Sequence, residues 1–453
     1  MPDMTRHLLT TRPADNIIAQ HNGTRIRVEK FLGHASALAA RLPDRPYVIN
    51  LCADRYEFLV GFCAAVIAGQ CTLMPPNRQP QTMLSVSGDY DGAYVLGRDR
   101  VEGLEFFALD RMEDGGVTEV PLVADDQLCA ILFTSGSTGE SKPNRKLWRT
   151  LRIGTASNVG LLLDAGEETL NVVATVPAQH MWGFEMSILL PLFANVVVSG
   201  RTPFFPQDIL EALQALPRPR ALVSSPVHLG AFLEADAGSA EIDRIYTATA
   251  PMPVDTARSL EKRFAAQVVD VFGCSESGII AARRLTVEKS WQLAEAFTLE
   301  RIEDGTLILA DHLDEQVPLN DRIELLGGQR FRWIGRDEDM INIAGKRGSL
   351  ADLNQRLNAL PDVHDGVIFV PHADAKRLAA LVVAPSLQPS DILAGLREAV
   401  EPAFLPRPVY MVSTLPRQDT GKLARKAILE LFAKLKRERQ EANDEENEQA
   451  SDD

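Results

Sequence analysis

Short apolar runs alternate with helical patterns along the N-terminal part of the chain. RPYVINLC and CTLMPP predict buried strands, and the run EFLVGFCAAVIAG between them predicts a buried helix. The same order recurs in LNVVATVP, MSILLPLFA and NVVVSG, and again in RALVSSP followed by VHLGAFLEA. Strands that alternate with helices predict parallel sheets covered by helices. We therefore expect an α/β fold with two parallel-sheet α/β subdomains in its N-terminal part.

The pattern changes at Ala281. From there to Trp333, short strands are separated by Gly and Asp turns, which predicts a small antiparallel or β-barrel-like layer. After GRDEDMINIAGKRG, two helical patterns and the strands DGVIFVP, RLAALVVAP and PVYMVS indicate a small α+β domain. We predict an N-terminal domain over residues 1–335, a C-terminal domain over 336–436 and a disordered acidic tail over 437–453.

Charge and composition exclude several classes of protein. Of the net charge of −15 over 453 residues, the segment Glu438–Asp453 contributes −7. The sequence contains no basic patch that would indicate a nucleic-acid partner. The run RKLWRTLR is interpreted as a solvated helix face. The five Cys show no CxxC spacing, which is typical of reduced thiols. The polar N-terminus and the short apolar run Phe58–Gly69 predict a cytoplasmic protein with no membrane partner.

The stretch ILFTSGSTGESKPNRK begins as a buried strand and continues as a loop of small and hydroxylated residues. Its glycines let backbone N–H groups turn toward one point, and its hydroxyls add further donors. The residues concerned are Thr134, Ser135, Gly136, Ser137, Thr138 and Gly139. Such a loop suits phosphate oxygens, but the GxxxxGK[ST] order of a P-loop NTPase is absent. On composition alone, a plain surface loop remains the alternative.

TSGSTGESK also resembles the phosphate-binding signature of the adenylate-forming (AMP-binding) superfamily. PAQHMWG, FGCSE, LND, GRDED, IAGKRG and LPRQDTGKLAR follow in the order of that family's motifs. The segment DRYEFLVGFCAAVIAGQCTLMPPNR is similar to its first α/β segment, so the resemblance spans nearly the whole chain outside the tail. The family joins a carboxylate to AMP with release of pyrophosphate and then transfers the acyl group to a thiol. The resemblance therefore implies ATP and Mg²⁺.

The resemblance implies a nucleotide site. Glu276 would bind Mg²⁺, and Phe272 would stack on adenine in place of the usual Tyr. Asp321 would bind the ribose, and Arg336 the ribose or a phosphate. The ATP- or AMP-binding residues implied in this way are Thr134, Ser135, Gly136, Ser137, Thr138, Gly139, Lys142, Ala248, Thr249, Ala250, Phe272, Gly273, Ser275, Asp321 and Arg336. An ordinary surface lysine is the alternative for Lys142.

The resemblance also implies a catalytic lysine and a mobile C-terminal domain. Lys422, in DTGK, would bridge the substrate carboxylate and the α-phosphate, and His180 would lie between the acid pocket and the thiol tunnel. Glu338 falls at the hinge, and Gly345 would leave room for a pantetheine arm. The pocket residues implied are His180, Met181, Trp182, Val271, Gly273, Gly278 and Ile279. Packing in the protein core is the alternative for His180 and for the apolar members of this set.

The substrate that we expect is an aromatic carboxylic acid. In amino-acid-activating members of the family, an Asp at about the position of His180 pairs with the substrate ammonium. No acidic residue lies beside His180 before Glu185, so the resemblance implies that the ammonium of a free amino acid would be buried without a partner. TLMPPNRQP, VPAQHMWGFE and VSSPVHL resemble the ligases of aryl polyene and xanthomonadin-type pigment clusters. Those enzymes load a hydroxybenzoate- or cinnamate-like acid onto an acyl carrier protein. Free coenzyme A as the acceptor, a non-catalytic nucleotide-binding regulator and a luciferase-like enzyme remain alternatives.

Overall fold

The computed structural model describes residues 5–116, 119–135, 141–164, 169–235, 238, 240–303, 305–336, 340–343, 346–372, 375, 377–418 and 423–451. The side chains of residues 134, 135, 141, 336, 340, 342, 346–348, 399 and 441–451 lie outside that description. The chain divides into two compact units. The first unit is Met1–Pro318 with Leu325–Arg332, and the second is Leu319–Glu324 with Trp333–Asp453. The predicted domain boundary at 335/336 stays a prediction.

One sheet of the first unit has six strands. These are β4 (Tyr47–Asn50), β5 (Cys71–Met74), β6 (Tyr94–Gly97), β7 (Glu105–Ala108), β9 (Leu128–Ser135) and β10 (Ser141–Leu147), in the order β10-β9-β5-β4-β6-β7. All neighbours pair in parallel except β10, which runs antiparallel to β9 at the edge of the sheet. The first parallel-sheet subdomain is therefore confirmed, with one antiparallel edge strand added.

The other sheet has eleven strands. They are β2 (Ile17–His21), β3 (Thr24–Arg27), β11 (Leu170–Ala174), β12 (Val196–Ser199), β13 (Arg220–Ser224), β14 (Arg244–Thr247), β15 (Gln267–Cys274), β16 (Gly278–Arg284), β17 (Trp291–Leu293), β21 (Asp321–Gly327) and β22 (Arg330–Arg336). Their order is β21-β22-β17-β16-β15-β14-β13-β11-β12-β2-β3, and the run from β15 to β2 is parallel. The pairs β15–β16, β16–β17 and β17–β22 are antiparallel, and so is β2–β3 at the other end of the sheet.

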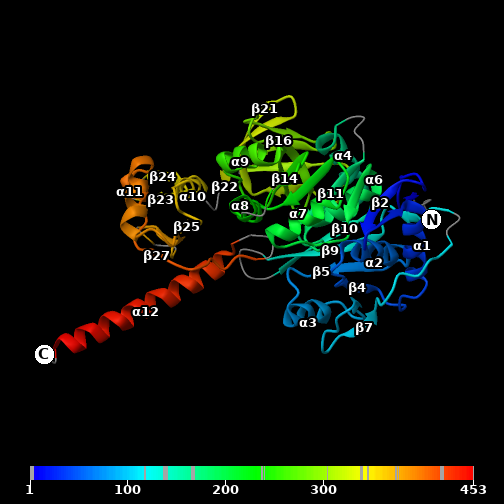
Figure 1. The fold of residues 1–453 in the computed structure, drawn as a ribbon, viewed down its shortest axis with the longest axis horizontal. Helices are drawn as coiled ribbons and strands as arrows, with labels where there is room; N and C mark the ends of the chain where they lie inside the picture. Colours follow the sequence, from blue (N-terminus) through cyan, green and yellow to red (C-terminus); the bar gives the residue numbers. More distant parts are fainter. Residues whose placement is uncertain are drawn as a thin grey trace. The chain divides into compact units, whose positions relative to one another are not determined.

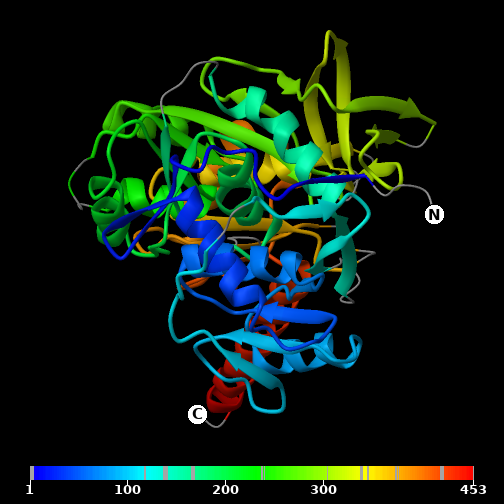
Figure 2. The same cartoon turned by 90° about the vertical axis from the view of Figure 1, so that its right-hand side faces the viewer.

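The helices of the first unit pack on these sheets (Figure 1). They are α1 (Val28–Ala39), α2 (Arg55–Ile67), α3 (Pro80–Gly88), α4 (Trp148–Leu162), α5 (Met181–Phe184), the π-helix η1 (Glu185–Leu189), α6 (Leu190–Phe193), α7 (Pro206–Gln214), α8 (Pro226–Glu234) and α9 (Val254–Phe264). One buried core joins α1, α2 and η1 to strands of both sheets. A second core packs α7, α8 and α9 on the larger sheet. Figure 2 shows the blue-to-cyan smaller sheet below the green-to-yellow larger one.

Helix α2 is buried along almost its whole length, as the apolar run predicts. Asp54 caps it by accepting from the backbone N–H groups of Tyr56 and Glu57, at 2.9 and 3.1 Å. Such a cap satisfies N–H groups that have no partner inside the helix. Within the part of the chain that the structure describes, no helix is long and apolar enough to cross a membrane.

Two small sheets complete the first unit and its boundary. Strands β1 (Arg6–Leu8) and β8 (Leu122–Ala124) form one of them, and β18 (Thr298–Ile302), β19 (Gly305–Leu309) and β20 (Val317–Leu319) form the other. The strands expected from Ala281 to Trp333 therefore divide between this three-stranded sheet and the antiparallel end of the larger sheet. The expected α/β fold is confirmed.

The second unit is a small α+β unit with its own core. Its elements include β23 (Met340–Ile343), β24 (Lys346–Ser349), α10 (Leu350–Asn358), β25 (Asp365–Phe369), β26 (Ala379–Val383), α11 (Pro389–Ala399), the 3-10 helix η3 (Pro402–Phe404), β27 (Val409–Met411) and α12 (Arg425–Ser451). Helix α12 is assigned as far as Ser451, and the predicted disordered tail over 437–453 stays a prediction. Its Glu, Lys, Arg, Gln and Ala residues are strong helix formers, and Lys434 pairs with Glu438 one turn away.

Candidate active site

Several candidate residues of the first unit follow the carboxyl ends of parallel strands in the larger sheet. His180 comes after β11, Ala248–Ala250 after β14, and Ser275 and Glu276 after β15. In open α/β sheets ligands bind outside these strand ends. The topology therefore brings residues from distant parts of the sequence to one edge of the sheet.

The predicted phosphate loop joins β9 to β10. Lys142 lies opposite Thr134 in the antiparallel ladder and is exposed, so it stands at the base of the loop. Residues 136–140, which include Gly136, Ser137, Thr138 and Gly139, lie outside the described residues, as do the side chains of Thr134 and Ser135. Pro143 sits in β10, and an edge strand tolerates a residue that donates no backbone hydrogen bond.

The turn between β15 and β16 carries Glu276 and Ser275. The register shifts between Phe272 and Gly273, and the two strand ends approach so closely that a Cβ on Gly273 would lie 2.3 Å from the carbonyl oxygen of Gly278. Gly278 has φ +78°, which favours glycine. The tight turn leaves the side chain of Glu276 exposed and that of Ser275 half-buried. Both glycines are therefore required by the backbone of the turn.

Phe272 belongs to an aromatic cluster. Its ring lies 5.2 Å from that of Trp291 and 5.4 Å from that of Phe331, in tilted and edge-on contacts. The guanidinium of Arg283 lies 4.3 Å from the Trp291 ring centre and is bound by Asp270. Phe272 stays half-buried. Its packed ring is thus fixed in orientation, as a stacking platform for a base requires.

The loop after β14 contains a strained residue. Thr249 has φ +80°, an outlier for a β-branched side chain. Strain of this kind costs about 1–3 kcal/mol and persists where the surroundings impose it, often at functional sites. Ala248 is buried beside it, and Ala250 is half-buried. The strained residue therefore lies in the loop where the resemblance implies ATP- or AMP-binding residues.

The residues expected to line the acid pocket come together in part. Trp182, Val271 and Ile279 belong to one buried cluster, and the indole Nε1 of Trp182 donates to the carbonyl of Ser224 at 3.1 Å. His180 is half-buried directly before the first turn of α5, and the methyl of Met181 would meet a Cβ on Gly278 at 3.2 Å. Gly273 is exposed on the turn. Trp182, Val271 and Ile279 are therefore buried, as the core-packing alternative requires.

Two buried charged residues were missed by the sequence reasoning. Lys146 is 1% exposed on β10, and its Nζ donates to the carbonyl oxygen of Glu276. Burial lowers the pKa of Lys146, and the negative charge of Glu185 opposes that shift. Trp148, which begins α4, is fully buried. The interpretation of RKLWRTLR as a solvated helix face is therefore wrong for Lys146 and Trp148, because Lys146 lies on a strand.

Glu185 begins the π-helix η1 and is 6% exposed. Both of its carboxylate oxygens accept from the backbone N–H of Ile279, at 3.0 and 3.1 Å. Burial raises the pKa of Glu185 to about 7, although the Ile279 hydrogen bond and Lys146 oppose the shift. A single acid within the apolar run MWGFEMSILLPLF was the signal that could have identified it.

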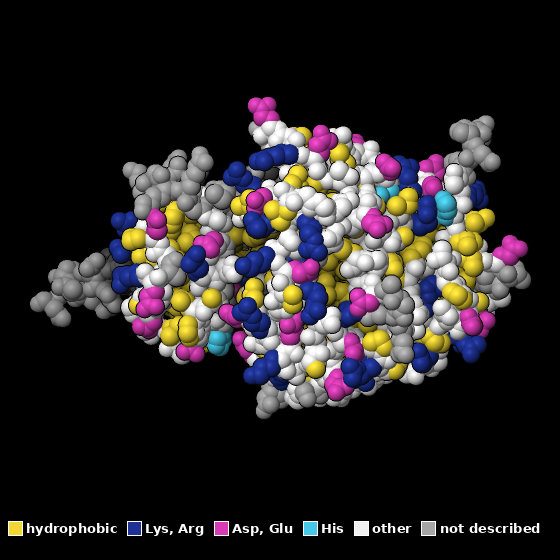
Figure 3. Space-filling view, turned by 90° about the horizontal axis from the view of Figure 1, so that it is seen from above, with side chains coloured by type: hydrophobic (Ala, Val, Ile, Leu, Met, Phe, Trp, Pro, Cys, Tyr) yellow, Lys and Arg dark blue, Asp and Glu magenta, His cyan; other side chains and the backbone are white. Residues whose placement is uncertain are grey.

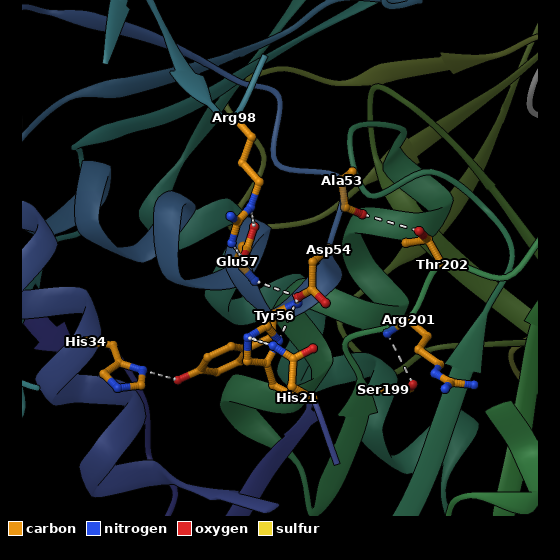
Figure 4. Close-up of polar contacts among 11 residues, drawn as sticks. His21, His34, Ala53, Asp54, Tyr56, Glu57, Arg98, Ser199, Arg201 and Thr202 are labelled. Atoms are coloured by element: carbon orange, nitrogen blue, oxygen red, sulfur yellow. Dashed lines mark hydrogen bonds and ion pairs between the residues drawn. The ribbon is translucent and has the colours of Figure 1, made fainter. Parts of the chain in front are cut away.

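A separate polar cluster, here called the α2 cluster, consists of His21, Asp54, Glu57 and Arg98 (Figure 4). His21 lies 3.2 Å from Asp54, and the buried Glu57 accepts from Arg98. The Asp54 hydrogen bond raises the pKa of His21 despite the opposing effect of burial. Close by, the Tyr56 hydroxyl lies 2.7 Å from His34, whose pKa burial lowers. The sequence motifs did not indicate this cluster.

The second unit holds the remaining candidates. The indole Nε1 of Trp333 donates to Asp321 at 2.8 Å. Arg336 ends β22, but its side chain lies outside the description, and so do Glu338, Gly345 and Lys422. Arg417 and Leu423 form an antiparallel bridge on either side of the segment that contains Lys422. Arg417 is held at 2.7 and 2.6 Å by Asp365.

The described residues contain no group of three or more His, Cys, Asp or Glu that could hold a metal ion. Mg²⁺ in nucleotide sites uses one or two carboxylates together with substrate phosphates and water. The exposed carboxylate of Glu276, on a turn whose backbone is fixed, fits that requirement.

Comparisons with known proteins agree with this geometry. A family model described as "AMP-binding enzyme" matches residues 48–302. A 4-coumarate–CoA ligase from Rhodobacter capsulatus is 30% identical over 284 residues, which cover 60% of this chain and 67% of that protein. The crystal structure of ATP-bound MatB from Rhodopseudomonas palustris superposes with a TM-score of 0.80 at 18% identity, over 92% of this chain and 96% of that one.

An AMP complex of the O-succinylbenzoate coenzyme A synthetase MenE from Bacillus subtilis superposes with a TM-score of 0.77 at 15% identity, over 93% and 98% of the two chains. These structures share the fold over nearly the full length of both chains. The family model covers more than half of the sequence, including the turn that carries Glu276. The chain therefore belongs to the AMP-binding enzyme family of adenylate-forming acid ligases.

Proposed function

We propose that this protein activates an aromatic carboxylic acid, hydroxybenzoate- or cinnamate-like, as an acyl-adenylate. It then transfers the acyl group to the phosphopantetheine thiol of an acyl carrier protein. In the first step a carboxylate oxygen bonds to the α-phosphorus of ATP, and the bond to pyrophosphate breaks. In the second step the thiolate sulfur bonds to the acyl carbon and AMP leaves.

The proposal that the substrate is an aromatic acid rests on the 30% identity to a 4-coumarate–CoA ligase within a shared family. The site is consistent with it. Glu185 is the acid nearest to His180 in the sequence, and its carboxylate is engaged by the backbone of Ile279. The Glu185 carboxylate therefore binds the β15–β16 turn and does not serve as the partner of a substrate ammonium. Burying such an ammonium without a partner would be costly.

Residue roles follow the family pattern. Glu276 would bind Mg²⁺ and Lys142 the phosphates, while Phe272 and the strained loop at Thr249 would enclose the adenine. Asp321 and Arg336 would bind the ribose, and Lys422 would neutralise charge between the carboxylate and the α-phosphate. Fixed donors and cations placed where charge develops lower the barrier to phosphoryl and acyl transfer.

The proposal also specifies which thiol accepts the acyl group. The resemblance to pigment-cluster ligases favours a carrier protein. The name of the 4-coumarate–CoA ligase favours free coenzyme A as the second candidate. Both acceptors present the same pantetheine thiol, so the chemistry at the acyl carbon is identical and only recognition of the rest of the molecule differs.

A panel of acids in a pyrophosphate-release assay tests the proposal. We expect release with 4-hydroxybenzoate and 4-coumarate, little with amino acids or fatty acids, and a loss of at least about 100-fold in Lys422→Ala. Repeating the best acid with a phosphopantetheinylated carrier protein and with coenzyme A identifies the acceptor from the thioester formed. Nucleotide binding with no acid-dependent release would contradict the proposal and favour the regulator.

A further inference from the structure

We propose that Lys146 and Glu185 are positioning residues that hold the β15–β16 turn in the conformation that binds Mg²⁺ and nucleotide. This inference rests on the proposed role of that turn. Glu185 is the last residue of VPAQHMWGFE and Lys146 follows TSGSTGESK, but the resemblance assigns no role to either residue. They reach the turn from two other parts of the chain.

Lys146 reaches the turn from the strand that follows the predicted phosphate loop. Along β10, Arg145 is exposed and Lys146 is buried, as alternation in a strand requires. The Lys146 ammonium donates to the main-chain carbonyl of Glu276 and leaves the Glu276 carboxylate exposed. The contact therefore fixes the backbone of the proposed metal ligand without using its side chain.

Glu185 reaches the same turn from the π-helix that follows α5. Its two oxygens share the N–H of Ile279, and its Oε1 would lie only 2.6 Å from a Cβ on Gly278. The carboxylate thus occupies the space that the glycine leaves open. Single π-helical turns occur frequently at functional sites, because they redirect one side chain out of the regular helix.

The charges themselves argue for a functional role. Burying two charged side chains costs desolvation that apolar side chains of similar size would avoid, so their burial is weak evidence for a role in stability. The backbone partner of Lys146 is the carbonyl of Glu276, and the backbone partner of Glu185 is the N–H of Ile279. An ammonium and a carboxylate satisfy these two groups in a way that apolar side chains would not.

The two anchors connect three parts of the proposed site. Lys146 connects strand β10 to the turn, and Glu185 connects the turn to the helical segment that begins directly after His180. Loss of either anchor should let the turn relax while the sheet beneath it remains intact. Partners of this kind, behind a metal ligand, typically change metal affinity or activity by about 10–100-fold when they are removed.

Four full-length variants test the inference: Lys146→Met, Glu185→Gln, the double variant, and Arg145→Met as the matched control on the exposed side of β10. Calorimetry measures Mg-ATP affinity, thermal unfolding measures stability, and the pyrophosphate assay gives the KM for Mg-ATP and kcat. We expect Lys146→Met and the double variant to weaken Mg-ATP binding by about 10–100-fold. Arg145→Met should bind like the wild type.

The double variant separates positioning from stability. Removing both charges leaves no unpaired buried charge, so its melting temperature should return toward the wild-type value while Mg-ATP affinity stays weak. Affinity within twofold of wild type in Lys146→Met or in the double variant would overturn the inference, and so would a double variant that does not fold. If nucleotide affinity changes as expected but no acid releases pyrophosphate, the assignment of the reaction fails and the positioning role stands.

Discussion

Two polar clusters in the first unit use charge in different ways. In the α2 cluster each charged group meets an opposite charge directly: His21 with Asp54, and Glu57 with Arg98 (Figure 4). Lys146 and Glu185 instead bond a backbone carbonyl and a backbone N–H of one turn. Direct pairs near solvent stabilise a helix end modestly, whereas buried charges on backbone groups fix the shape of a turn. We therefore expect the α2 cluster to affect stability, and Lys146 and Glu185 to affect nucleotide binding.

The largest expected effect concerns the exposed carboxylate on the anchored turn. Glu276→Gln should lower acid-dependent pyrophosphate release by about 100- to 1,000-fold, since a fixed charge at the reacting phosphates is lost. Its melting temperature should stay near the wild-type value, because exposed substitutions change stability by about 0.5 kcal/mol or less. A near-normal rate at saturating Mg²⁺ would contradict the role of Glu276.

A methyl group at Gly278 tests the space that Glu185 occupies. Gly278→Ala combines φ +78° with a Cβ 2.6 Å from the carboxylate oxygen, so we expect a loss of about 1–3 kcal/mol in unfolding free energy. Gly160→Ala is the control, because Gly160 lies inside α4 with nothing within 4 Å of an added Cβ. It should gain about 0.5–1 kcal/mol. Denaturant titration measures the unfolding free energy of both variants. Equal stabilities of Gly278→Ala and Gly160→Ala would contradict the expected steric conflict with Glu185.

The direct pairs of the α2 cluster should matter less. Arg98→Ala leaves the buried Glu57 carboxylate without its guanidinium, but Arg98 is 57% exposed and water can replace it in part. We expect a loss of about 1 kcal/mol by denaturant titration, with no change in the KM for Mg-ATP. The double variant Arg98→Ala/Glu57→Gln should recover part of the loss. A drop in nucleotide affinity would place this cluster with the functional residues.

The smallest effect is a pH dependence of stability. The pKa of His21 is raised above 6.5 by Asp54, so its contribution is full below pH 6.5 and disappears as the pH rises through the folded-state value. His34, whose pKa burial lowers, acts in the opposite sense in the same range. The difference in melting temperature between the wild type and His21→Gln should therefore shrink as the pH rises above 6.5. If the melting-temperature difference between the wild type and His21→Gln did not change with pH, the His21–Asp54 pair would not be the source of the pH dependence.

Much of the fold followed from the sequence. The buried helix α2, the strands β4, β5, β11, β12 and β13, and the α/β class were predicted from apolar runs whose length and composition suit buried elements. The extent of α12, to Ser451, was not predicted, because the acidic composition indicated solvation and the helix propensity of its Glu, Lys, Arg, Gln and Ala residues was not considered.

The site was predictable only where local motifs describe it. FGCSE lies at the turn between β15 and β16, where Gly273 is in close approach to Gly278 and Gly278 has a positive φ. No motif gives Lys146 or Glu185 a role, since the proposed role depends on contacts between residues more than 90 positions apart in the sequence. Long-range contacts of this kind become visible only in three dimensions.

On the surface seen in Figure 3, basic side chains lie interspersed with acidic ones. Charged side chains of both signs therefore share this face of the protein.

Direct detection of the intermediate is the most decisive measurement. The protein would be incubated with Mg-ATP and 4-hydroxybenzoate or 4-coumarate in the absence of any thiol, and the quenched mixture analysed by mass spectrometry. We predict an aroyl-AMP together with an equal amount of pyrophosphate, and neither product when the acid is omitted. Bound ATP that remains intact with every aromatic acid tested would contradict acyl-adenylate formation by this chain.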